Sequence, residues 1–153
     1  MANTYHQLCI QTVFAVKYRQ AVLQPDWQSR LWAVIGNLLN EEGCQTIIVN
    51  GVEDHVHCFF SLKPVLALSE VMKAVKAKSS KWINDQNLAP ARFEWQEGYG
   101  AFSYGRSQVP QVYRYILNQA EHHRKRTFRE EYVELLRKFE IPFEGKYLFE
   151  DLK

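Results

Sequence analysis

Residues 46–63 read TIIVNGVEDHVHCFFSLK, two apolar runs separated by a polar turn. The runs Thr46–Val49 and His55–Lys63 are rich in β-branched and aromatic residues, and each is typical of a strand. The intervening residues Asn50–Asp54 fit the loop of a hairpin. We therefore expect two neighbouring antiparallel strands joined by this turn.

On both sides of this hairpin the chain alternates between strand and helix patterns. Strands are expected at Tyr5–Ala15 (with one covered face), Thr46–Val49, His55–Lys63 and Ala101–Tyr104, and helices from Pro25 to Gly43, Leu68 to Asp85, Pro110 to Lys125 and Phe128 to Phe139. This order predicts an α+β, ferredoxin-like fold (split βαβ): an antiparallel sheet with helices on one face, and extra C-terminal helices. The first and third strands are then central neighbours, and the third strand is a rigid base for chemistry. The tail 141–153 is expected to be irregular.

Composition sets limits on the class of protein. The chain has 153 residues, 46% hydrophobic and 14% aromatic, and is expected to form a single domain over residues 1–153. Its net charge of +2 excludes a nonspecific basic binder, so contacts with nucleic acid must come from local patches. Three cysteines without a CxxC pair argue against a disulfide framework and a cysteine zinc knuckle. No segment has the pattern of a membrane span or a signal peptide, so we expect a cytoplasmic protein.

His55 and His57 form the first candidate site. Side chains alternate along a strand, so both imidazoles are expected on one face, with Val56 and Cys58 on the other. Two neutral imidazoles side by side can share one cation and leave most of its coordination positions to substrate oxygens. The acidic residues just before them are expected to serve the turn. The alternative is that the two histidines are ordinary polar residues at the start of a strand.

The second candidate site is VYRYILNQAEHH, residues 112–123. On a helix Tyr115 and Gln119 are one turn apart and share a face, whereas Tyr113 lies about 200° around the helix from Tyr115. A phenol suits reversible phosphoryl transfer, because the phosphotyrosine ester conserves the energy of the broken bond. Gln119 offers a neutral oxygen as a further metal ligand. The alternative is that Tyr115 is an amphipathic core residue, the commoner role of a helix tyrosine.

Together the two patterns resemble the HUH superfamily of endonucleases, in which two histidines flanking a hydrophobic residue bind a metal. The single tyrosine, the YIxNQ helix and the small size resemble the IS200-like single-tyrosine HUH transposases of insertion sequences, the TnpA family. Further similar segments are VKYR at 16–19, EDHVHCFF at 53–60, WQEGYGAFS at 95–103 and YILNQAEHH at 115–123. The resemblance covers nearly the whole chain, in the order of the family.

The resemblance implies that His55 and His57 are metal ligands, that Gln119 is the third ligand, and that Tyr115 is the nucleophile. It implies a transposase that cuts and rejoins single-stranded DNA with Mg²⁺ or Mn²⁺, leaving a 5′-phosphotyrosine and a free 3′-hydroxyl. The implied partners are DNA hairpins near the ends of an element and a second copy of the chain, because the family acts as homodimers. In many members the tyrosine helix of one subunit completes the site of the other. Neither a membrane nor a small-molecule cofactor is expected.

Two groups of basic residues are candidates for contacts with DNA phosphates. The first group directly follows the tyrosine helix, close to where a phosphate backbone would lie, and comprises Arg124, Lys125, Arg126 and Arg129. The second group lies on the predicted helix Leu68–Asp85 and includes Lys73 and Lys76. A solvated face is the default interpretation for this second group.

Three other functions stay open on the sequence alone. A non-catalytic single-stranded nucleic-acid binding module would share the ferredoxin-like plan with RNA-recognition domains, and would bind RNA tightly in a chelator. The aromatic residues Tyr99, Phe102 and Tyr104 can either stack on unpaired bases or fill the core. A metal-dependent hydrolase would use water in place of Tyr115. A domesticated relative would process repeated hairpins without moving its own element.

Overall fold

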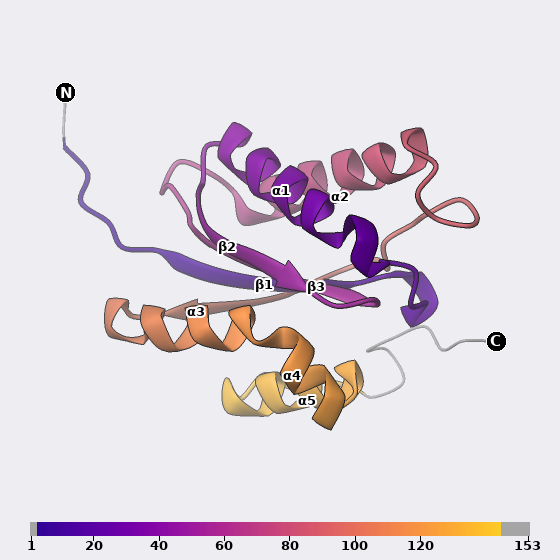
Figure 1. Ribbon diagram of the computed structural model, residues 1–153. Coiled ribbons are helices and arrows are strands. Elements are labelled where there is room, and N and C mark those ends of the chain that lie inside the picture. The colour runs from indigo at the N-terminus through magenta and orange to yellow at the C-terminus, as the bar shows by residue number, and fades with distance from the viewer. Residues whose placement is uncertain (1–2, 145–153) are drawn as a thin grey trace.

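A four-stranded sheet lies between two layers of helices in the computed structural model, which describes residues 3–144 (Figure 1). The strands are β1 (Cys9–Ala15), β2 (Gln45–Gly51), β3 (His55–Ser61) and β4 (Gly100–Tyr104), and the α-helices are α1 (Pro25–Glu41), α2 (Leu68–Asp85), α3 (Val109–Leu117), α4 (Gln119–Lys125) and α5 (Phe128–Lys138). The strand order is β2-β3-β1-β4, and each neighbouring pair is antiparallel. This confirms the ferredoxin-like plan with the first and third strands at the centre.

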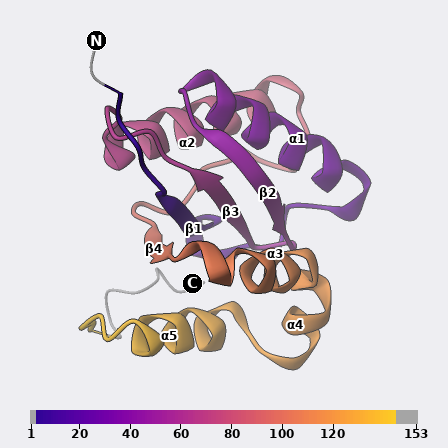
Figure 2. The ribbon, with the colours of Figure 1, turned by 90° about the vertical axis from the view of Figure 1, so that its left-hand side faces the viewer.

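Each face of the sheet carries its own core. Helices α1 and α2 cover one face, and α3, α4 and α5 cover the other (Figures 1 and 2). The first core includes Phe14, Val56, Phe60, Leu31, Ile35 and Val75. The second includes Val13, Phe59, Val112, Ile116, Phe128 and Leu135. The expectation of one covered face for the first strand is therefore wrong, because the C-terminal helices bury its second face.

Strand β3 has the alternation that the sequence predicts. Val56 and Cys58 lie in the core beneath α1 and α2, while His55 and His57 face the C-terminal helices, where they contact residues of α4 and α5. The hairpin that precedes β3 requires a glycine at residue 51. A Cβ atom on Gly51 would lie 2.2 Å from the carbonyl oxygen of His55, so no larger residue permits this close return of the chain.

Two element boundaries differ from the prediction. Strand β1 begins at Cys9 and not at Tyr5, because its neighbours β3 and β4 end opposite Cys9. The single helix expected from Pro110 to Lys125 is two helices, α3 and α4, which meet at Asn118 with φ −97° and ψ 28°. From residue 145 on, the tail that was predicted to be irregular lies outside the described residues.

The side chain of Asn50, on β2, explains where α3 ends. Its amide donates hydrogen bonds to the carbonyl oxygens of Ile116 (2.9 Å) and Leu117 (3.1 Å). The last carbonyls of a helix lack partners within that helix, and here the sheet supplies them. The last turn of α3 is thereby attached to the sheet.

Two smaller expectations concern cysteines and membranes. Cys9, Cys44 and Cys58 are free and buried, which is the usual state of a small apolar side chain. Across residues 3–144, none of the helices has the length and apolar character needed to cross a membrane.

Candidate active site

Strand β3 presents His55 and His57 side by side, with ring centroids 5.2 Å apart. Both side chains are buried. The Nδ1 atom of His55 lies 2.7 Å from a carboxylate oxygen of Asp54, and that of His57 lies 2.9 Å from the side-chain amide of Gln11. Phe128 stacks on the His55 ring at 4.1 Å. Metal-binding histidines are commonly oriented in this way through their second ring nitrogen, so Asp54 does more than form the turn.

The Nε2 atoms of both histidines face side-chain oxygens of the C-terminal helices. The Oε1 atom of Gln119 lies 3.1 Å from Nε2 of His55. The Oε1 atom of Glu131 lies 3.0 Å from Nε2 of His57 and 3.3 Å from Nε2 of His55. Gln119 and Glu131 are 0% and 4% exposed, so the four groups meet in the interior of the protein. The ligand atoms of His55, His57 and Glu131 are close enough to hold one metal ion.

Tyr115 reaches the same cluster from α3. Its hydroxyl donates a hydrogen bond to Oε2 of Glu131, and its ring meets the edge of His57 with centroids 5.9 Å apart. The ring is half-buried against the second core, so the core interpretation is correct for the ring, while the hydroxyl points into the site. Tyr113, in contrast, is 40% exposed. Tyr115 and Gln119 thus share a site, as their spacing predicts.

The histidines and Glu131 shift each other's proton affinity. Burial raises the pKa of Glu131, but hydrogen bonds from His55 and His57 outweigh it and hold that pKa well below its usual range. Burial lowers the pKa of His55, but hydrogen bonds to Asp54 and Glu131 outweigh it and raise the pKa to about 9. For His57, burial dominates and lowers the pKa. Burial and the charge of Glu131 together raise the pKa of Tyr115 well above its usual range.

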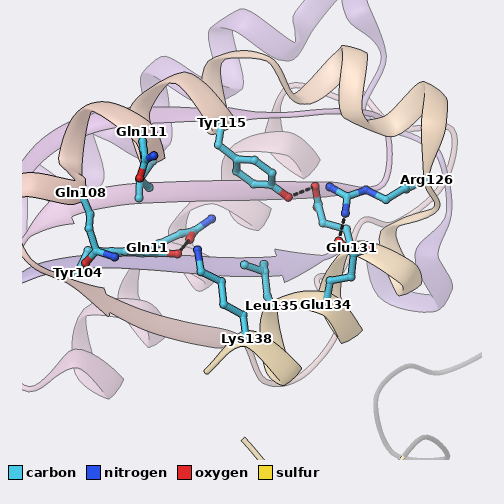
Figure 3. Close-up of a pocket in the computed structure, with 11 residues that line it drawn as sticks. Gln11, Tyr104, Gln108, Gln111, Tyr115, Arg126, Glu131, Glu134, Leu135 and Lys138 are labelled. Atoms are coloured by element: carbon cyan, nitrogen blue, oxygen red, sulfur yellow. Dashed lines mark hydrogen bonds and ion pairs between the residues drawn. The ribbon is translucent and has the colours of Figure 1, made fainter. Parts of the chain in front are cut away.

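A cavity of about 540 Å³ lies beside Tyr115, between α3 and α5. Figure 3 shows the Tyr115 hydroxyl joined to Glu131 on one side of this cavity. Arg126, Lys138 and Gln111 also line it. The cavity offers space next to the phenol, and its charged side chains are Arg126 and Lys138 together with Glu131 and Glu134, of which Glu134 pairs with Arg126.

The predicted basic residues fall into two regions. Arg126 lines the cavity beside Tyr115, and Arg124 and Lys125 line a second pocket of about 430 Å³ together with Asp54 and His123. Arg129 lies in the first turn of α5. Arg124, Lys125 and Arg126 therefore lie next to residues of the site.

Lys73 and Lys76 are not brought to the site. They lie on α2, across the sheet from α3, α4 and α5 (Figure 1). The ammonium group of Lys76 donates to the carbonyl oxygens of Gln96 and Gly98, at 2.7 Å each, and so fixes the loop before β4. The solvated-face interpretation is the better one for exposed Lys73.

The aromatic residues before and within β4 pack mainly inside the protein. Phe102 and Tyr104 belong to the second core, where they are 3% and 7% exposed. Tyr99 packs against the first core. The core interpretation is therefore correct for Phe102 and Tyr104. The Tyr104 hydroxyl donates to Oε1 of Gln11 at 2.7 Å and so connects β4 to the site.

Sequence reasoning missed two residues of the site, Glu131 and Gln11. Glu131 follows another glutamate and looks like part of a solvated helix face, yet it is in helical phase with the buried residues Phe128 and Leu135. An acidic residue within an apolar stripe is a signal that could have identified it. Gln11 alternates with the more apolar positions of the segment Tyr5–Ala15, which predicts the uncovered face of that strand for it, but it is 1% exposed.

The donor set fits a divalent cation. Two imidazole nitrogens and two side-chain oxygens, from a carboxamide and a carboxylate, lie within about hydrogen-bonding distance of one another. Donors of these types bind divalent cations and leave coordination positions for water and phosphate oxygens. His55, His57 and Gln119, the ligands expected from the sequence, are all within this cluster.

Comparison with known proteins places this chain in a family. The family model described as "Transposase IS200 like" matches residues 4–119. The ISDra2 transposase TnpA of Deinococcus radiodurans is 29% identical over 76 residues, which are 50% of this chain and 54% of that protein. The chain thus spans about half the length of that curated relative.

Two solved structures share the fold. The crystal structure of a Deinococcus radiodurans R1 protein designated a transposase has a TM-score of 0.63 and 20% identity, and the match covers 78% of this chain and 95% of that one. The structure of a REP-associated tyrosine transposase bound to a REP hairpin has a TM-score of 0.60 and 13% identity, covering 80% of this chain and 73% of that one. At these identities the likeness concerns the fold alone. Because the family model extends over residues 4–119 of the 153, this chain belongs to the IS200-like transposase family.

Proposed function

We propose that this protein is a tyrosine transposase that cuts and rejoins single-stranded DNA at hairpin-marked ends through a metal-assisted 5′-phosphotyrosine intermediate. One observation carries the proposal: the phenol of Tyr115 and the Nε2 atoms of His55 and His57 meet on a single carboxylate. The fold relative that is bound to a REP hairpin supports hairpin DNA as the partner.

In this proposal His55, His57 and Gln119 hold one Mg²⁺ or Mn²⁺ ion. When bound, the cation polarises the scissile phosphate and offsets the negative charge that develops there. The chain holds the two imidazoles on a central strand and orients them through Asp54 and Gln11. Rigid support of this kind is what a catalytic site needs.

Tyr115 is the nucleophile. The phenol gives up its proton and its oxygen forms a bond to phosphorus as the bond to the 3′ oxygen breaks. The 3′ oxygen takes up a proton and leaves as a hydroxyl, while the 5′-phosphate stays on the tyrosine. The number of phosphate ester bonds is unchanged, so a DNA 3′-hydroxyl can later reverse the step without another energy source. Arg126 lines the cavity beside Tyr115, and Arg124 and Lys125 line the pocket beside Asp54. We assign these three residues, together with Arg129 at the start of α5, to the phosphate backbone.

The decisive test compares Tyr115→Phe with Tyr113→Phe. Each variant is incubated with single-stranded hairpin DNA and Mn²⁺, and protein–DNA adducts are sought on a denaturing gel. Tyr115→Phe removes one oxygen and should reduce cleavage by about a thousandfold or more, with hairpin binding retained. Tyr113→Phe is the matched control, because that side chain is exposed, and it should still form the adduct.

The same assay tests the cation. Cleavage by the wild-type protein should vanish in a chelator and return with Mg²⁺ or Mn²⁺. An adduct formed by Tyr115→Phe but not by Tyr113→Phe would show that Tyr113 is the nucleophile. Cleavage without an adduct from any variant would indicate a hydrolase that uses water, and full activity in the chelator would remove the metal from the mechanism.

A further inference from the structure

Glu131 is the one site residue for which neither the family match nor the proposed mechanism provides a role. The family model ends at residue 119, and Glu131 lies twelve residues beyond Gln119, on α5. Its carboxylate is nevertheless at the centre of the cluster. We infer that Glu131 is a further protein ligand of the same cation, so that cation binding fastens α5 over the site. The inference rests on the metal-assisted function proposed above.

Burial makes the position of Glu131 costly without a positive partner. The side chain is 4% exposed, and a carboxylate removed from water destabilises the fold unless it is paired. Its contacts are the Nε2 atoms of His55 and His57, the amide of Gln119 and the hydroxyl of Tyr115. A protonated His55 can supply the positive charge that pairs with Glu131, and a cation bound between the same atoms would supply it in place of that proton.

The contact between His55 and Asp54 leaves room for a cation on the other side of the His55 ring. When Nδ1 of His55 carries the proton and donates it to Asp54, Nε2 presents a lone pair. The Oε1 atoms of Glu131 and Gln119 then face that lone pair at 3.3 and 3.1 Å. Acceptor atoms at such distances repel one another unless a proton or a cation lies between them.

The separations agree with a metal site. Around an octahedral Mg²⁺ ion with bonds of about 2.1 Å, adjacent ligand atoms are about 3 Å apart. The three measured separations are 3.0, 3.1 and 3.3 Å, between nitrogen and oxygen atoms of His55, His57, Gln119 and Glu131. An anionic oxygen added to two neutral nitrogens strengthens binding of a hard cation.

The second carboxylate oxygen extends the role of Glu131 to the nucleophile. While Oε1 faces the histidines, Oε2 accepts hydrogen bonds from Tyr115 and from the amide of Gln119. One side chain of α5 therefore contacts both the cation site and the phenol. Loss of the cation should then loosen α5, and cation binding should slow hydrogen exchange of the backbone amides of α5.

The test measures Mn²⁺ binding to the metal-stripped chain by titration calorimetry, without DNA. Glu131→Gln preserves the shape of the side chain and removes its charge, and should weaken Mn²⁺ affinity by at least about 10-fold. Glu134→Gln is the matched control. Glu134 is on the same helix but exposed, and pairs with Arg126; its variant should bind Mn²⁺ as the wild type does. Hydrogen exchange gives a second readout: Mn²⁺ should protect the amides of α5 in the wild type but not in Glu131→Gln.

The outcomes separate this inference from the proposed function. If Glu131→Gln binds Mn²⁺ as tightly as the wild type, Glu131 is paired with a histidine proton and is not a cation ligand. The inference then falls, while the histidine site stands. If the wild type binds no Mn²⁺ and His57→Ala changes nothing, the metal in the proposed function falls as well. If circular dichroism shows that Glu131→Gln is unfolded, Glu131→Asp retains the charge and shortens its reach. Its Mn²⁺ affinity should then be lower than that of Glu134→Asp, and equal affinities would overturn the inference.

Discussion

Gln11 connects the histidine pair to the second core. It lies between Nδ1 of His57, at 2.9 Å, and the hydroxyl of Tyr104, at 2.7 Å. If His57 binds a cation through Nε2, its Nδ1 carries the proton and needs an acceptor. In the structure the NH₂ group of Gln11 faces Nδ1 of His57, and the Gln11 oxygen accepts from Tyr104. Cation binding by His57 therefore requires the Gln11 amide to turn over, so that its oxygen accepts from His57 and its NH₂ group donates to Tyr104, because a phenol both donates and accepts. Gln11 can therefore select the form of His57 that binds metal.

We expect Gln11→Leu to weaken Mn²⁺ affinity about 10- to 100-fold, because it removes the group that orients His57. The change also leaves the Tyr104 hydroxyl buried without Gln11, so unfolding should become easier by about 1–3 kcal/mol. Titration calorimetry and denaturant unfolding measure the two effects. Tyr104→Phe is the control: it leaves the contact between Gln11 and His57 in place and should affect metal binding much less. Equal Mn²⁺ affinities for Gln11→Leu and the wild type would show that Gln11 has only a structural role.

For single residues, the sequence predicts which side chains share a site when those residues are close together in the chain. His55 and His57 share a face because a strand alternates, and Tyr115 and Gln119 meet because a helix repeats every 3.6 residues. Glu131 differs from its neighbour Glu130 only in helical phase, and its partners are up to 76 residues away, counting from His55. No local sequence pattern connects residues so far apart, so the place of the Glu131 carboxylate in the site is visible only in the structure.

Helix α5 has a start that can be read in the sequence. Thr127 accepts a hydrogen bond from the backbone N–H of Glu130, at 3.1 Å, and Glu130 in turn accepts from the backbone N–H of Thr127, at 3.2 Å. This reciprocal capping box satisfies N–H groups that lack partners within the helix. It sets the helical phase in which Phe128 and Glu131 turn inward.

Replacing Thr127 with Ala should reduce the free energy of unfolding by about 1 kcal/mol, the usual cost of losing an N-cap hydroxyl. Urea denaturation provides the measurement, and Thr127→Ser, which retains the hydroxyl, should be close to the wild type. Glu131 lies within the turn that this cap stabilises, so fraying of α5 should also weaken Mn²⁺ binding. An unchanged urea midpoint in Thr127→Ala would show that packing alone holds the start of α5.

The elements themselves were mostly predictable, and the exceptions have tertiary causes. The β2–β3 hairpin, α1 and α2 follow from apolar periodicity bounded by turn residues. The break at Asn118 does not, because the side chain that takes the carbonyls of α3 is Asn50, 66 residues before Ile116. The register of β1 likewise depends on where β3 and β4 end.

In the whole molecule, α3, α4 and α5 lie against the sheet of their own chain (Figure 2). Tyr115 therefore contacts His57 of the same chain. The resemblance implied a homodimer in which tyrosine helices are exchanged. A homodimer stays a prediction, but the site is geometrically complete without such an exchange.

We therefore expect no recovery of cleavage when Tyr115→Phe and His57→Ala chains are mixed. Each chain lacks one half of the site, and no hybrid forms if Tyr115 serves its own histidines. The measurement is adduct formation on hairpin DNA after the two proteins have been mixed and allowed to exchange subunits. A parallel mixture of each variant with wild type controls for inhibition by inactive chains. Recovery well above that of either variant alone would show that α3 is exchanged between subunits.

The hydrogen bonds from Asn50 to Ile116 and Leu117 limit how Tyr115 can move during an exchange of DNA strands. Tyr115 precedes the first of these anchored residues, so its helix cannot swing away from the sheet while both bonds persist. Under the proposed function, a DNA end joined to Tyr115 would remain above the histidines of the same chain. The incoming end would have to be brought to it, and the bending and pairing of the DNA would determine which two ends are joined.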